Sequence, residues 1–195
     1  MGRLLGGLLV LVVGVALAAE LLLPSLLAAR VEERVREHTR DVAAVDAEVG
    51  ARPFLPPLAL EGRVDTLRVE LTEVAGRTLD TATVTFALED LTLDRSRLLA
   101  GDLHVTAIGR GVAELTLTDA RIGRVSEAAD GIGADAARWA GRVLELAPEG
   151  MDRLEIPVDH ELLPCAPDVT VEDDTVRLRC ALEDVPPVLV NLATG

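Results

Sequence analysis

The spacing of apolar residues changes from a helical period to an alternating one near residue 62. Before this point, the segment 25–45 carries apolar residues about one helical turn apart, with charged residues between them. These apolar positions are Leu27, Val31, Val35 and Val42. Their spacing predicts an amphipathic helix with a narrow apolar stripe. Gly50 and Pro53 then break the chain.

From Gly62 onward, apolar and polar residues alternate along several short segments. The apolar positions are Leu67, Val69, Leu71, Val84, Phe86, Leu88, Leu103, Val105, Leu115 and Leu117. This alternation predicts strands that bury one face, as in antiparallel meanders. Its phase changes at Glu89 and Asp90, where we expect a bulge or a bend. The pattern therefore predicts a single α+β domain with one highly curved antiparallel sheet and few helices.

The pattern after residue 118 is more mixed. Asp119 is a favourable N-cap for a helix that ends near residue 129. A second helix is predicted over residues 134–144, after the break at Gly-Ile-Gly. The segment 154–158 alternates again and predicts a further strand.

The N-terminus has the composition of an export segment. Arg3 precedes the uncharged, mostly apolar run Leu4–Ala19, and Ala16-Leu17-Ala18 has the form of a signal-peptidase site. If Glu20 is tolerated near an interface, Leu4–Ala29 is long enough to span a membrane with tilt. A cleaved signal peptide and a retained anchor both remain possible interpretations.

In either case we expect residues 1–29 to be the signal peptide or anchor, and residues 30–195 to form one domain outside the cytoplasm.

Cys165 and Cys180 are the only cysteines. An even pair in an exported chain is most simply a disulfide. The alternating residues between them predict a hairpin that brings the two close together. The alternative is a free nucleophilic or metal-binding cysteine.

The net charge of −14 bears on the choice of partners. A chain this acidic repels phosphate backbones, and it has no basic stripe with interleaved aromatic residues, so nucleic acid is excluded as a partner. Contact with an anionic membrane surface would have to be apolar, with local help from arginine. The chain contains arginine but no lysine, which suggests a high-GC genome.

The sequence shows no arrangement typical of a catalytic or cofactor site. Its histidines and serines are His38, His104, His160, Ser25, Ser96 and Ser126. The histidines lack metal-ligand spacing, and no serine lies in a nucleophile elbow. Without lysine there is no phosphate-binding loop of the Walker type. We expect no metal and no cofactor, and we expect that the protein is not an enzyme. A hydrolase with dispersed carboxylates is the remaining catalytic alternative.

Residues 51–60 form a proline-punctuated apolar cluster before the first alternating strand. One interpretation is a loop that packs on an ordinary core. The other is the mouth of a partly open concave sheet that holds an acyl chain. Burial of each CH₂ is favourable by about 0.8 kcal/mol and needs no catalytic group.

The order of these features resembles the LmeA-like phospholipid-binding family of actinobacterial cell-envelope proteins. The motifs that carry the resemblance are Pro53-Phe54-Leu55, Gly62-Arg63-Val64, and the paired cysteines followed by Val-Pro-Pro. The resemblance covers residues 30–192. It implies an elongated sheet wrapped around a long amphipathic helix, similar to lipid-binding tubular folds. It also implies binding of phospholipids, with phosphoinositides as one candidate class.

Under this resemblance, the alternating apolar residues above would hold acyl chains. Phe54, Leu55 and Leu58 would form a lip at the membrane surface, where apolar side chains partition favourably. Arg52 and Arg63 are the head-group candidates. The main alternative is a membrane-anchored adaptor that regulates an envelope glycosyltransferase without holding lipid.

Overall fold

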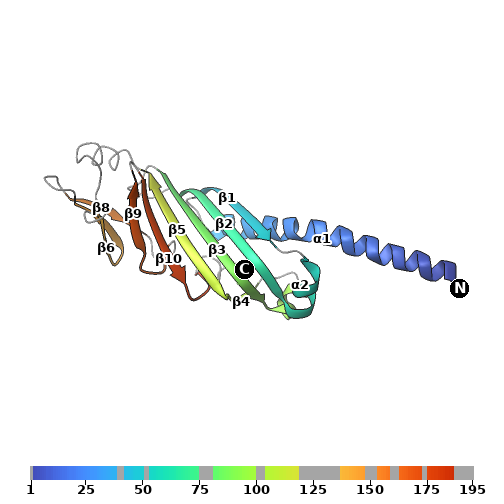
Figure 1. Cartoon of the computed structure of the whole chain (residues 1–195). Helices are drawn as coiled ribbons and strands as arrows, with labels where there is room; N and C mark the ends of the chain where they lie inside the picture. Colours follow the sequence, from blue (N-terminus) through green and yellow to red (C-terminus); the bar gives the residue numbers. More distant parts are fainter. Residues whose placement is uncertain are drawn as a thin grey trace.

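The computed structural model describes residues 2–38, 42–50, 53–74, 81–99, 104–118, 137–147, 153–158, 163–172 and 175–186 (Figure 1). In chain order the elements are α1 (Gly2–His38), β1 (Val42–Gly50), α2 (Leu55–Glu61), β2 (Arg63–Val74), β3 (Thr81–Leu93), α3 (Arg95–Leu99), β4 (Val105–Ala107), β5 (Arg110–Thr118), β6 (Ala137–Ala140), β7 (Val143–Leu146), β8 (Leu154–Pro157), β9 (Asp168–Glu172) and β10 (Thr175–Leu182).

The strands form two antiparallel sheets. The main sheet has the order β1-β2-β3-β5-β10-β9, and the short strand β4 pairs with the end of β3. Strands β6, β7 and β8 form a small second sheet, which lies at the opposite end of the molecule from the projecting half of α1 (Figure 1). The prediction of a single α+β domain built on an antiparallel sheet is confirmed.

The register of the main sheet brings its apolar residues into rows on one face. One row crosses five strands and consists of Val45, Leu71, Val84, Leu115 and Leu178. The neighbouring row consists of Ala47, Val69, Phe86, Ala113 and Cys180, so the bulky Phe86 lies between smaller side chains. Every member of both rows is buried. We call this surface the inner face. Contacts between neighbouring side chains within these rows stabilise the sheet and fix its register.

The predicted change of phase in β3 is confirmed. Asp90 has a φ of 53°, and Leu88 and Leu91 both point into the core although they are three positions apart, which in a regular strand would put them on opposite faces. Strand β2 changes phase with it, because Val64 and Leu67 are also both buried and pair with Leu91 and Leu88. The two strands therefore bend together and keep their pairing.

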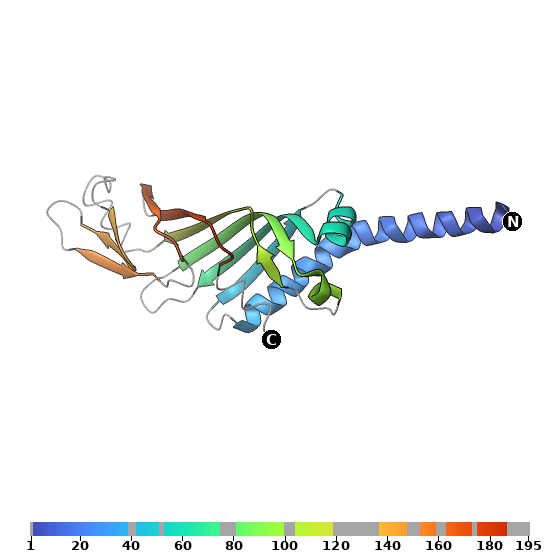
Figure 2. The same ribbon diagram turned by 90° about the horizontal axis from the view of Figure 1, so that it is seen from below.

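Helix α1 is continuous over 37 residues and includes Pro24. The predicted stripe is confirmed where it meets the domain: Val31 and Val35 are buried, Leu27 packs against the core, and the helix lies along β1 (Figure 2). The prediction that the helix continues to residue 45 is wrong. Residues 42–50 form an edge strand instead, because pairing with β2 satisfies their backbone groups and turns Val45 and Ala47 inward.

The helix predicted over residues 134–144 is also wrong. Residues 137–140 and 143–146 are strands β6 and β7, joined by a tight turn at Gly141, which has a φ of 70°. This conformation is accessible to glycine and ends a helix, and Leu144, Leu146 and Ile156 bury their side chains across the small sheet. Strand β8 confirms the alternation seen over residues 154–158. The helix predicted from Asp119 lies outside the described residues.

The expected disulfide joins Cys165 to Cys180, with 6.0 Å between their Cα atoms. The intervening chain forms the β9–β10 hairpin, so this part of the prediction is confirmed. Because Cys180 belongs to an inner-face row, the disulfide ties the segment before β9 to the apolar side of the main sheet.

We expect loss of the disulfide to lower the free energy of unfolding by about 3 kcal/mol, since the closed loop restricts the unfolded chain. Urea unfolding of the oxidised chain should therefore be compared with unfolding in reductant. The C165A/C180A variant is the control, because reductant should leave its midpoint unchanged. Equal midpoints for the oxidised and reduced chain would contradict the expectation.

Candidate functional site

The structure brings most of the predicted acyl-chain residues together on the inner face. Those buried there or beside it are Leu67, Val69, Leu71, Val84, Phe86, Leu88, Val105, Leu115 and Leu117. The remaining member, Leu103, lies outside the described residues. None of the nine is more than 8% exposed. An acyl chain therefore reaches this surface only if an element that covers it moves.

The apolar cluster at residues 53–60 forms α2 and the turn before it. Proline is favourable in the first turn of α2, where backbone N–H groups have no helical partner. Gly62 ends the helix with a φ of 69°, and its N–H donates to the Leu58 carbonyl at 3.0 Å. The sequence identified the cluster, but the helix within it was not predicted.

Helix α2 turns its apolar residues in two directions. Phe54 and Leu58 are buried in the core, and Leu55 is half-buried. Leu60 is 71% exposed. Of the residues proposed for the lip, Phe54 and Leu58 thus face inward in this conformation. Leu60, which was not proposed for the lip, is the large apolar residue of α2 that faces solvent.

The interaction that holds α2 in place comes from a carboxylate in the apolar part of α1. Glu20 accepts hydrogen bonds from the backbone N–H groups of Phe54 and Leu55, the latter at 2.8 Å. These N–H groups lie at the start of α2 and lack helical partners, so a carboxylate there is favourable. The sequence signal is the single charge within Leu4–Ala29, whose apolar surroundings point to a membrane position and not to a contact with a helix N-terminus.

The head-group candidates have different outcomes. Arg52 lies outside the described residues. Arg63 opens β2 with an exposed side chain that pairs with Glu61 at 3.2 Å. Arg95, which the sequence did not indicate, donates to the Leu60 carbonyl at 3.0 Å. Two arginines thus flank the C-terminal end of α2.

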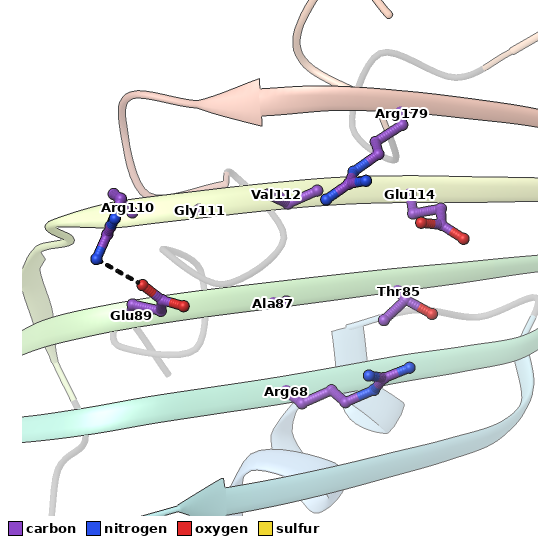
Figure 3. A pocket seen from close by; sticks show the side chains of 9 residues that line it. All are labelled: Arg68, Thr85, Ala87, Glu89, Arg110, Gly111, Val112, Glu114 and Arg179. Atoms are coloured by element: carbon purple, nitrogen blue, oxygen red, sulfur yellow. Dashed lines mark ion pairs between the residues drawn. The ribbon is translucent and has the colours of Figure 1, made fainter. Parts of the chain in front are cut away.

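A shallow hollow of about 380 Å³ opens on the other face of the main sheet (Figure 3). It exists because the short side chains of Ala87 and Val112 are register neighbours, with longer residues around them. The residues that line it are Arg68, Thr85, Ala87, Glu89, Arg110, Gly111, Val112, Glu114 and Arg179.

Ion pairs offset much of the charge around this hollow. Arg110 pairs with Glu89 at 3.1 Å, and Glu114 pairs with Arg177 at 3.3 Å. Because side chains alternate between the two faces of a strand, the hollow lies on the opposite side of the sheet from the apolar rows. It is therefore not continuous with the inner face.

A second hollow of about 410 Å³ lies beside the disulfide. It is lined by Pro164, Cys165, Ala181, Leu182, Glu183, Asp184, Val185 and Pro186. Within the described part of the chain, no group of three or more His, Cys, Asp or Glu side chains is arranged to hold a metal ion.

Helix α1 has the length and composition of a membrane-spanning segment. The candidate span is Val13–Glu33, with a mean hydropathy of 1.6, and a signal sequence near an N-terminus has the same properties. The helix and the disulfide both fit a location outside the cytoplasm.

The candidate site thus lies in an α+β domain that has one continuous apolar sheet face and is joined to an apolar N-terminal helix. A sequence model of the LmeA-like phospholipid-binding family matches residues 18–194. The chain belongs to this family, as the resemblance suggested. Neither the curated proteins nor the solved structures contain a match to the chain. The division at residues 29 and 30 stays a prediction, although Glu20 and Leu23, before that point, already contact the domain.

We expect F54A to lower the free energy of unfolding by about 3–5 kcal/mol, because it leaves a cavity in the core. L60A, in the same segment, should change it by less than about 0.5 kcal/mol, because Leu60 is exposed. Urea unfolding of both variants checks the two orientations. Equal, small effects would contradict the inward position of Phe54.

E20A should cost about 1–2 kcal/mol, since it removes the acceptor for two N–H groups of α2. The matched control on the same helix is E33A, because Glu33 pairs with Arg30 at the exposed surface, at 3.4 Å. This exposed pair should contribute less than about 0.5 kcal/mol. Thermal unfolding of the two variants would show the difference, and an E20A midpoint equal to that of E33A would contradict it.

Proposed function

We propose that the protein is an exported cell-envelope protein that holds phospholipid acyl chains between α1 and the inner face of the main sheet. Membership of the phospholipid-binding family supports lipid as the ligand. The single observation that carries the location is the pair of apolar rows across the inner face. In this proposal the sheet curves around α1, and lipid metabolism of the envelope is the process served.

The energetics favour uptake despite the closed core. Burial of about ten methylenes would be favourable by about 8 kcal/mol. Loss of the packing of one large core side chain costs about 2–5 kcal/mol. Relative to a lipid in water, this burial therefore offsets the lost packing of one such side chain. The elements best placed to move are α1 and α2, which contact the main sheet at β1 and β2.

We place the entrance at α2. This helix is short, it contacts both α1 and β2, and its Leu60 is exposed. Arg63 and Arg95 lie beside it and would meet the phosphate of a lipid whose chains enter there. The hollow of Figure 3 is a poor head-group site for the same lipid, since the sheet separates it from the inner face.

The direct test is native mass spectrometry of the chain after incubation with phospholipid vesicles and removal of free lipid. We expect a mass increase that corresponds to bound phospholipid, which solvent extraction then identifies. A mass equal to that of the bare chain, together with no binding to vesicles, would refute the proposal.

Two Ala→Leu variants on opposite faces of the sheet locate the site. A113L fills the inner face beside Phe86 and should reduce the lipid-bound fraction. The added side chain should also cost about 1–3 kcal/mol of stability. A87L lies on the exposed face of the adjacent strand and should leave lipid binding unchanged. Cooperative unfolding of both variants is the control for folding, and equal lipid binding by both would refute the location.

The same variants separate lipid binding from an adaptor role. An A113L protein that holds no lipid yet retains its function in the envelope would support the adaptor and its glycosyltransferase partner instead. That the protein is not an enzyme stays a prediction. Turnover of a lipid or glycan that a single Asp or Glu substitution abolishes would contradict it.

A further inference from the structure

The exposure of α1 changes at Glu20. From Val13 to Ala18 every residue is exposed, on all sides of the helix. After Glu20 only one side remains exposed, with Leu21, Leu22 and Leu26 facing outward. The opposite side carries Leu23, Leu27, Ala28, Val31 and Val35, which pack against the domain.

This change limits which residues lipid can surround. The apolar window Val13–Glu33 includes residues that contact the domain, so a bilayer cannot enclose that whole window. Residues 2–22 are continuous helix and precede most of these contacts. At 1.5 Å per residue they extend about 31 Å, and the uncharged run Leu4–Ala19 within them extends about 24 Å, so Arg3 and Glu20 lie close to the two edges of the roughly 30 Å hydrocarbon core of a bilayer.

The surface next to this boundary is suited to a membrane interface. Helix α2 lies where α1 leaves the sheet, and both views place the small β6–β8 sheet at the far end (Figures 1 and 2). Leu60 is exposed there, and the side chains of Arg63 and Arg95 flank it. Exposed apolar residues with adjacent arginines are typical of segments that lie in the head-group region.

We propose that α1 remains attached and crosses the bilayer up to about Glu20, and that α2 thereby lies in the head-group layer with Leu60 inserted. The occupant of this surface is the lipid bilayer itself. Glu20 fixes the arrangement, because its carboxylate bonds the start of α2 to the helix at the membrane boundary. The Cys165–Cys180 disulfide fits a domain outside the cytoplasm, and the N-terminus of α1 then lies on the cytoplasmic side.

This placement does not depend on lipid uptake into the core. A protein with a permanently closed core would have the same orientation on the membrane. Native mass spectrometry tests the uptake, whereas the experiment below tests the orientation, so the two can fail separately.

Fluorescence quenching by lipid measures the orientation. Trp139 is the only tryptophan and lies in β6, far from α2. The full chain is reconstituted in phosphatidylcholine–phosphatidylglycerol vesicles, with or without brominated phosphatidylcholine. We expect the bromolipid to leave wild-type emission unchanged and to remove most of the emission of an L60W/W139F variant. If W139F impairs folding, L60W alone replaces it, and the quenched component is the difference from wild type.

The Glu20 contact is tested in the same L60W background. E20A should reduce the quenching, since it releases α2 from α1, and E33A should leave it unchanged. An unquenched L60W tryptophan would overturn the proposal. Equal quenching of Trp139 would also overturn it, because the domain would then lie flat. So would an intact mass showing that envelope-purified protein lacks residues 1–18.

Discussion

The structure depends on a constraint of strand geometry: alternate side chains point to opposite faces of a sheet. The register between β2 and β3 is the pairing through which this constraint acts. It places Leu71 opposite Val84 and Val69 opposite Phe86, and the rows extend through β5 and β10 without a change of face. A slip of one residue would expose the whole apolar set. The concerted bend at Asp90 preserves this pairing, because β2 changes phase at the same place.

The same constraint explains why the sheet could be predicted and other parts could not. A period of two is visible in a single strand, so the inward residues of β2, β3 and β5 and the cysteine hairpin followed from the sequence. The segment 134–144 contains good helix formers such as Ala and Arg, and it is the pairing of residues 137–140 with 143–146, and of 143–146 with β8, that makes them strands. The predicted end of the first helix was wrong for the same reason, because residues 42–50 pair with β2 and form a strand.

The least predictable part of the site was the junction of α1 and α2. Glu20 and Phe54 are far apart in the chain, and no periodic pattern links a carboxylate to backbone N–H groups. Nor could periodicity distinguish the inward Phe54 from the outward Leu60, because α2 is a short helix that begins with prolines. The family resemblance identified the segment, and the direction of each side chain required the structure.

The unbroken course of α1 has a mechanical consequence. No loop separates its projecting half from the part that packs on β1, so a tilt of the projecting half acts directly on the main sheet. A bilayer thinner than the apolar length of a spanning helix makes that helix tilt. In this protein such a tilt would lean the entire sheet over the membrane and carry the β6–β8 end sideways. The height of the domain above the lipid would then vary with the thickness of the bilayer.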